Sequence, residues 1–152
     1  MGRSMNILFY LTPKCDCAYI DTSDTLRQAM EKMEYHRYSA IPILDEGGSY
    51  VGILTEGDLL WNIKNKYDLD LKEAENVPVT DVDRKRDYTP VSIRSSMEDL
   101  INVALSQNFV PVVDDADKFI GIVTRKDIIK YFSEKISKLE AMASEKEECR
   151  IA

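Results

Sequence analysis

Two copies of a short pattern, Thr-x-x-Asp, each follow an apolar run and precede a stretch with helical character. The first pairs Thr55 with Asp58, and the second pairs Thr124 with Asp127. A helix N-terminus offers unpaired backbone N–H groups and the positive end of the helix dipole, which favour a phosphate. A carboxylate one turn further on can accept both hydroxyls of a ribose. The pattern is therefore compatible with a nucleotide site.

The same pattern also has a purely structural interpretation. A threonine followed three residues later by an acid forms a capping box, in which each side chain accepts a hydrogen bond from the other residue's backbone N–H group, and no ligand is needed. Taken as an isolated pattern, either copy fits capping better than ligand binding. One helix start can serve both purposes, so both interpretations stay open.

The two patterns belong to a longer internal repeat. The segment Ile-Pro-Ile-Leu-Asp at residues 41–45 is matched by Val-Pro-Val-Val-Asp at residues 110–114. A constant separation of 69 positions relates four pairs of unlike residue types: Pro42 and Pro111, Gly52 and Gly121, Thr55 and Thr124, and Asp58 and Asp127. Such a register indicates two copies of one supersecondary unit.

Each copy predicts the order strand, helix, strand, strand, helix. The first strands are expected at about residues 18–20 and 89–93, and the helices after them at Asp24 and at Ser95 or Ser96 as N-caps. Two β-branched strands around a tight turn indicate a hairpin. Because one unit of about 55 residues leaves an apolar sheet face exposed, the two units are expected to pack together.

The chain of 152 residues divides into five segments under this interpretation. The tail carries Ile136 and Leu139 at amphipathic spacing, so it either continues the last helix or covers a partner. Met5 is as good a start as Met1, which leaves open whether residues 1–4 are native. The segments are an N-terminal segment (1–11), repeat 1 (12–64), a connecting segment (65–79), repeat 2 (80–132) and a C-terminal helical tail (133–152).

Composition narrows the classes of function. A net charge of −7 argues against nucleic-acid binding, which requires neutralisation of phosphates. No apolar run approaches the roughly 18 residues of a membrane span, and the N-terminus lacks a convincing signal peptide. The expectation is a cytoplasmic protein that contacts neither nucleic acid nor membrane. Neither an activated nucleophile nor a metal cluster is visible, so the chain is not expected to be an enzyme.

The cysteines and the histidine allow little chemistry. Cys15, Cys17 and Cys149 show no spacing typical of a zinc site, and their odd number argues against a disulfide scaffold. Cys15 and Cys17 could hold a soft metal with His36, but packing is the preferred interpretation. His36 is the only histidine, and no motif positions it as a base. No metal and no cofactor are therefore expected.

The doubled pattern resembles the tandem CBS domain pair, also called a Bateman module. The resemblance covers about residues 12–132 and rests on apolar-Pro-apolar-apolar-Asp, a turn, and Gly-apolar-apolar-Thr-x-x-Asp in both copies. It implies an α+β (α/β) fold of two β-α-β-β-α repeats, packed through their sheets with pseudo-two-fold symmetry. It also implies a non-catalytic, stand-alone sensor that binds an adenosine-containing ligand between the repeats, commonly as a homodimer, and that regulates another protein.

The resemblance assigns the adenine end of a main cleft to repeat 1. Ala18 is expected beside the base, and Tyr38 is expected to stack on it. Ser39 and Ala40 supply backbone contacts to the edge of the base, while Pro42 fixes the strand. Tyr38 is equally compatible with a role as core filler, because burial of an aromatic ring is favourable without a ligand.

The phosphate and ribose end of the main cleft falls in repeat 2. Thr124 and Arg125 are expected to meet phosphate, and Asp127 is expected to hold the ribose. A cation at a helix start opposes the helix dipole unless it is exposed or faces an anion. Arg125 therefore supports the assignment.

A second, weaker cleft would use Thr55 and Asp58 with Thr89, Asn108 and Phe109. The last three residues are expected to replace Ala18, Tyr38 and Ser39. Glu56 is expected beside the phosphate position, where an acid repels the ligand. This cleft is therefore predicted to be weak or empty. The basic run at residues 84–86 is either a solvated turn or a contact to a polyphosphate tail.

Two functions compete. The leading hypothesis is a homodimeric sensor for AMP, ADP, ATP, S-adenosylmethionine or cyclic di-AMP that modulates a partner protein. The alternative is a structural dimerisation or interaction module that binds no nucleotide to a useful degree.

Overall fold

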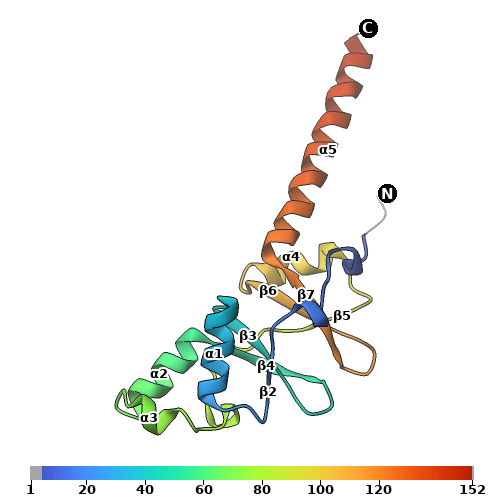
Figure 1. The fold of residues 1–152 in the computed structure, drawn as a ribbon. Coiled ribbons are helices and arrows are strands. Elements are labelled where there is room, and N and C mark those ends of the chain that lie inside the picture. The colour runs from blue at the N-terminus through green and yellow to red at the C-terminus, as the bar shows by residue number, and fades with distance from the viewer. Residues whose placement is uncertain (1–4, 152) are drawn as a thin grey trace.

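The computed structural model describes residues 5–151, in which two small sheets face each other and one long helix leads away from them (Figure 1). In repeat 1 the strand order is β2-β3-β4, with β2 parallel and β4 antiparallel to β3. The helices α1 and α2 follow β2 and β4. The bounds are β2 (Ile20–Asp21), α1 (Leu26–His36), β3 (Ala40–Leu44), β4 (Tyr50–Thr55) and α2 (Glu56–Lys66).

Repeat 2 has the same order of elements and carries one additional strand, β1, which precedes the first strand of repeat 1 in the chain. Its sheet runs β1-β7-β6-β5. A 3-10 turn at Met97–Leu100 leads into a short helix where repeat 1 has α1. The bounds are β1 (Thr12–Pro13), β5 (Val91–Ser92), α4 (Ile101–Ala104), β6 (Phe109–Val113), β7 (Phe119–Thr124) and α5 (Arg125–Ile151).

The strands of the two hairpins pair in the same register, in agreement with the sequence repeat. Ala40 lies opposite Thr55 in the first hairpin, and Phe109 lies opposite Thr124 in the second. Both members of the second pair follow those of the first by 69 positions. The predicted fold of two β-α-β-β-α repeats is therefore confirmed, with each Thr-x-x-Asp pattern at the junction of a strand and a helix.

The core consists of three apolar clusters, one within each repeat and one between them. One lies under the helices of repeat 1, and the second lies under those of repeat 2. The third lies between the sheets, and the two hairpin turns also meet, since Phe119 N–H donates to Gly48 O at 3.0 Å. The cluster between the sheets contains Ala40, Leu44, Ile53, Phe109, Phe119 and Ile122.

Strand β1 was not predicted from the sequence. Thr12 pairs with Ile122 and Pro13 with Gly121, so the start of the chain extends the sheet of repeat 2. Gly121 has φ +155°, and a Cβ atom there would lie 2.1 Å from Thr12 O. Glycine at this position is therefore needed for the close approach of β1.

Two local predictions are corrected. The first strands are shorter and begin later than expected, at Ile20 and Val91. Thr25 caps α1 in place of Asp24, because Thr25 and Gln28 form a reciprocal capping box. Asp24 instead accepts from Asp21 N–H at 3.0 Å and pairs with a lysine of α1. Ser96 is the N-cap of the 3-10 turn in repeat 2, as predicted.

The connecting segment and the tail have defined structures. The segment contains the short helix α3 (Leu71–Ala74), and Ala74 is completely buried against repeat 1. The tail continues the last helix, as one of the two expectations held, and makes α5 27 residues long. Within residues 5–151, no helix combines the length and the apolar character that crossing a membrane requires.

Candidate functional site

A hollow of about 220 Å³ lies between the repeats and brings several predicted residues together. From repeat 1 it is lined by Tyr38, Ser39 and Ala40, and from repeat 2 by Thr124. Ligand pockets span roughly 300–1,000 Å³. The inter-repeat hollow lies below this range, so it can take only part of a nucleotide, such as the base, and the rest would have to lie at its open side. Its remaining lining residues are Arg37, Asn108, Phe109 and Ile122.

The residues predicted at the adenine end differ in their surroundings. Tyr38 is half-buried, lines the hollow and packs against the core of repeat 1, which agrees with both roles considered for it. Pro42 is buried within β3, opposite Ile53. Ala18 belongs to the core of repeat 1 and does not line the hollow.

Thr124 and Asp127 form only half of a capping box. Asp127 N–H donates to Thr124 Oγ1 at 3.2 Å. The Asp127 carboxylate is half-exposed and accepts no hydrogen bond from any residue in the described part of the chain. Asp127 does not line the hollow itself but lies one helical turn along the chain from Thr124, which does. Its carboxylate is thus free for a ligand that extends from the hollow.

Arg125 takes a different position from the one predicted. Its Nε donates to Ala104 O at 2.8 Å and to Gln107 O at 3.1 Å. Ala104 is the last residue of the short helix α4 and Gln107 follows shortly after it, so both carbonyls lie at the negative end of the helix dipole. The guanidinium therefore stabilises the end of α4, and it lines an outer groove rather than the hollow.

Thr55 and Asp58, by contrast, form the complete capping box. Asp58 is 7% exposed, and its Oδ2 accepts from Thr55 N–H at 3.1 Å. Thr55 Oγ1 in turn accepts from Asp58 N–H at 3.0 Å. The remaining Oδ1 accepts from Lys85 N–H at 3.3 Å. Both carboxylate oxygens are occupied by the protein's own backbone, so the structural interpretation holds for this copy.

The segment that supplies Lys85 is fastened to repeat 1 by side chains. The buried Asn62 amide accepts from Asp83 N–H at 3.2 Å and donates to Asp83 O at 3.0 Å. Arg84 donates to Ile53 O at 3.2 Å and forms an ion pair with Asp87. Asp87 in turn accepts from Ile53 N–H at 3.1 Å. Arg84 is therefore no solvated turn residue, because it binds the edge of β4.

The strand register corrects the correspondence between the two clefts. With Phe109 equivalent to Ala40, Asn108 is equivalent to Ser39, and Gln107 takes the place of Tyr38. Gln107 is buried, and its amide accepts from Thr89 N–H at 2.8 Å and donates to Thr89 O at 3.3 Å. Sequence reasoning missed Gln107, although the 69-residue offset from Tyr38 points to it.

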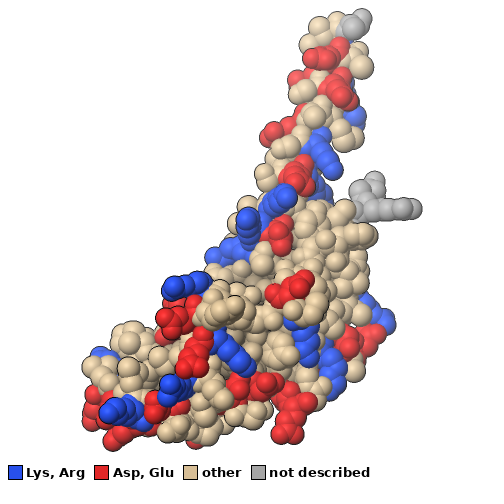
Figure 2. Space-filling model, viewed as in Figure 1, with Lys and Arg blue, Asp and Glu red and all other residues tan. Residues whose placement is uncertain are grey.

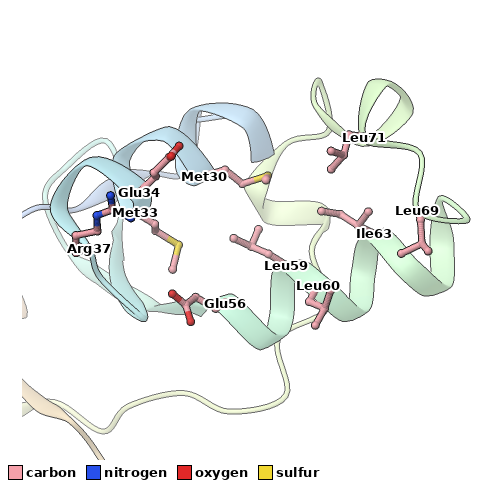
Figure 3. A pocket seen from close by; sticks show the side chains of 10 residues that line it. All are labelled: Met30, Met33, Glu34, Arg37, Glu56, Leu59, Leu60, Ile63, Leu69 and Leu71. Atoms are coloured by element: carbon pink, nitrogen blue, oxygen red, sulfur yellow. The ribbon is translucent and has the colours of Figure 1, made fainter.

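Two hollows larger than the inter-repeat hollow lie on the outer helical faces, and of the predicted nucleotide residues only Arg125 lines one of them. One, of about 580 Å³, lies between α1 and α2 and is mainly apolar (Figure 3). Glu56 lines this groove, so the charge expected beside the second phosphate position faces the outer surface. The other, of about 590 Å³, lies between α4 and α5.

The described residues contain no group of three or more His, Cys, Asp or Glu side chains that could hold a metal ion. Cys15 and Cys149 are exposed. Cys17 is half-buried, and its thiol donates to Thr12 O at 3.4 Å. Burial raises the pKa of this thiol to about 11, which favours the inert protonated form.

Comparison with known families agrees with the internal repeat. The sequence model of the CBS domain matches residues 10–65 and residues 77–134, which together cover most of the chain. Among curated proteins, "Uncharacterized protein MJ1225" of Methanocaldococcus jannaschii is 25% identical over 130 residues, covering 78% of this chain and 46% of that protein. The chain spans about half or less of the length of the first curated relatives it matches.

Solved structures share the fold along most of their length. The crystal structure of Listeria monocytogenes CbpB in complex with c-di-AMP has a TM-score of 0.74 at 22% identity, covering 87% of this chain and 98% of that one. CBSX2, an Arabidopsis thaliana protein solved in complex with AMP, has a TM-score of 0.68 at 22% identity, covering 88% and 98%. At this level of identity the likeness establishes the fold.

Proposed function

Because the chain belongs to the CBS domain family, we propose that it is a non-catalytic regulatory sensor for an adenosine-containing ligand. The observation that carries the proposal is the meeting of Tyr38, Ser39 and Ala40 with Thr124 around one hollow, one helical turn from the free carboxylate of Asp127. The base occupies the hollow, and the ribose lies at Asp127. The phosphate lies at the N-terminus of α5, where backbone N–H groups and the helix dipole favour an anion.

The chemistry of the ligand follows from these partners and from the relatives. CbpB and CBSX2, which share the fold, were solved with c-di-AMP and with AMP. AMP, ADP, ATP, S-adenosylmethionine and cyclic di-AMP all carry the adenosine group that the cleft is proposed to hold. Since Arg125 is directed to the end of α4, the phosphate contacts come from Thr124 and the start of α5 rather than from that guanidinium.

Regulation requires that the ligand bind two states of the protein with different affinity. The hollow is lined by both repeats, so a ligand in it contacts both and favours the relative placement that suits its contacts. The apolar cluster between the sheets, with Phe109 and Phe119, is the surface along which that placement changes. A protein partner that distinguishes the two placements is then regulated by the ligand. The functional unit is proposed to be a homodimer.

The test is nucleotide-induced thermal stabilisation of two variants. At a ligand concentration of about 100 times the dissociation constant, binding adds about 2.7 kcal/mol to the free energy of unfolding. For a chain of this size each kcal/mol raises Tm by about 2–4 °C. Asp127→Asn should lose most of this shift. Glu134→Gln, the same chemical change at an exposed position of α5, should keep it.

The experiment runs over a panel of AMP, ADP, ATP, S-adenosylmethionine and cyclic di-AMP. If none of the five raises the Tm of the wild-type protein, the sensor function is wrong, and a structural interaction module is left. If Asp127→Asn and Glu134→Gln respond alike, the ligand binds elsewhere.

A further inference from the structure

The inter-repeat hollow carries a positive charge that the proposed ligand contacts do not use. Among the described residues that line the hollow, Arg37 is the only charged one. Arg37 is the C-cap of α1, and its backbone is left-handed, with φ 56° and ψ 37°. Glycine is the usual residue in this conformation at a helix end. A large cationic side chain therefore stands at a position whose backbone favours glycine.

The guanidinium of Arg37 is exposed and forms no hydrogen bond or ion pair with any residue in the range 5–151. Arg37 also lies at the end of the outer groove where α1 ends (Figure 3). Glu34 and Glu56 line that groove with it, but neither forms an ion pair with it. Arg125, in contrast, is bound to two backbone carbonyls. The guanidinium of Arg37 is thus free for a ligand in the hollow.

The protein as a whole carries a charge that repels anions, since its net charge is −7. Figure 2 shows acidic and basic side chains interspersed over repeat 1, so no broad basic surface on that face of the repeat attracts a phosphate. The residue 69 positions after Arg37 is Ser106, which is uncharged. A cation therefore stands at only one of the two related positions, on the hollow that Thr124 also lines.

The chemistry of a guanidinium distinguishes between the candidate ligands. Its planar fork of N–H groups binds phosphate through charge-assisted hydrogen bonds, which are about twice as strong as neutral ones. A phosphate beside Thr124 lies in the hollow that Arg37 lines, so both repeats can contact it. S-adenosylmethionine carries a positive sulfonium where adenosine nucleotides carry the 5′-phosphate, and a guanidinium repels that charge.

We propose that Arg37 selects adenosine 5′-phosphates over S-adenosylmethionine and over adenosine, by binding the phosphate from the side of repeat 1. The inference rests on the proposed function and narrows its ligands to AMP, ADP, ATP and cyclic di-AMP. Arg37 takes the role that the sequence predicted for Arg125. The 5′-phosphate then joins Arg37 of repeat 1 to Thr124 of repeat 2.

The first experiment measures the dissociation constants of AMP and adenosine, which differ only in the phosphate, by isothermal titration calorimetry. In Arg37→Gln the constant for AMP should rise about tenfold, because one charge-assisted contact at an exposed site is lost. The constant for adenosine should stay within about twofold. Arg37→Lys, which keeps the charge without the planar fork, should recover part of the affinity for AMP.

Arg150→Gln is the matched control for this experiment. It makes the same change of charge at an exposed position near the end of α5, so it should bind AMP like the wild-type protein. A wild-type protein that binds adenosine as tightly as AMP would overturn the proposal. Equal losses of AMP and adenosine affinity in Arg37→Gln would also overturn it.

The second experiment compares ligands of opposite charge and varies the salt concentration. The wild-type protein should bind AMP at least about tenfold more tightly than S-adenosylmethionine, and Arg37→Gln should narrow this ratio. The advantage of AMP over adenosine should shrink as salt rises from about 0.01 M to about 1 M, because the Debye length falls from about 30 Å to about 3 Å. Tighter binding of S-adenosylmethionine than of AMP, or the same salt dependence in both proteins, would overturn the proposal.

Failure of this inference is distinguishable from failure of the sensor function. Binding of adenosine or S-adenosylmethionine that is unchanged in Arg37→Gln, without a preference for AMP, would leave the sensor function standing and refute selection by Arg37. No binding of any of these ligands to the wild-type protein would refute both. Without ligand, Arg37→Gln should melt like the wild-type protein, because the Arg37 side chain forms no hydrogen bond or ion pair with the rest of the described chain.

Discussion

The stretch of residues 83–87, at the start of repeat 2, is held to repeat 1 partly by one amide, and replacing that amide tests how the stretch is held. Asn62 is 6% exposed, and its side chain makes three hydrogen bonds: two with the backbone of Asp83 and one, at 2.9 Å, with Asp58 O. In Asn62→Ala the two bonds to Asp83 are lost. The third lost bond frees a carbonyl that already sits within α2.

The expected cost follows from the two hydrogen bonds lost to the backbone of Asp83. A hydrogen bond of this kind contributes about 1 kcal/mol net, so the free energy of unfolding should fall by about 2 kcal/mol. For a chain of 152 residues, this corresponds to a fall in Tm of about 4–8 °C. Asn65→Ala is the matched control, because Asn65 is exposed on the same helix, and its cost should stay within about 0.5 kcal/mol.

Thermal unfolding and urea unfolding of both variants provide the measurement. If Asn62→Ala unfolds at the same temperature and urea concentration as Asn65→Ala, the Asn62 amide does not hold the stretch around Asp83, and the position of Lys85 N–H against the Asp58 carboxylate would need another cause.

Two further predictions concern the residues in contact with β1. Gly121→Ala should lower the free energy of unfolding by about 2–3 kcal/mol, because its Cβ atom would meet Thr12 O at 2.1 Å on a backbone with φ +155°. Gly57→Ala is the control and should be neutral or slightly stabilising, because its Cβ atom has no contact closer than 3.7 Å. Equal melting temperatures of the two variants would contradict this reasoning. Cys17, with its pKa raised to about 11, is protonated up to that pH, so at pH 8 its thiolate fraction is about 100-fold below that of a thiol at the ordinary value of 9.0. Alkylation followed by mass spectrometry should therefore modify Cys15 and Cys149 first, and equal rates for all three would show that β1 does not shield Cys17.

The sequence predicts those parts of the fold that follow from local pattern and from the repeat. The 69-residue offset anticipates that Ala40 faces Thr55 in the same way as Phe109 faces Thr124, because strand pairing within a hairpin is fixed by its turn and its apolar alternation. The same offset anticipates that Thr124 and Asp127 begin a helix. Which repeat-1 residues meet Thr124 depends on how the two units pack.

The contacts that sequence reasoning missed join residues with no periodic relation to each other. Arg125 turns to the carbonyls of Ala104 and Gln107 because the second copy is shorter before its hairpin, which ends α4 early and leaves those carbonyls open. The pairing of Arg84 and Asp87 with both backbone groups of Ile53 replaces the strand that β1 supplies in the other repeat. Neither arrangement leaves a signature in hydrophobic spacing.

The two clefts differ for a reason that the sequence only partly anticipates. The second cleft was predicted to be weak because of the charge of Glu56, but that side chain lines the outer groove between α1 and α2. The structural difference lies in the carboxylates: Asp58 is bound by Thr55 and Lys85 backbone N–H groups, whereas Asp127 accepts no hydrogen bond within residues 5–151. This difference supports a single strong site per chain, as a prediction.

Isothermal titration calorimetry of the wild-type protein, with the nucleotide that stabilises it most, tests the central claim most directly. The account predicts one saturable site per chain, lost in Asp127→Asn and retained in Glu134→Gln. Two equal sites per chain, or a stoichiometry of one that survives Asp127→Asn, would contradict it.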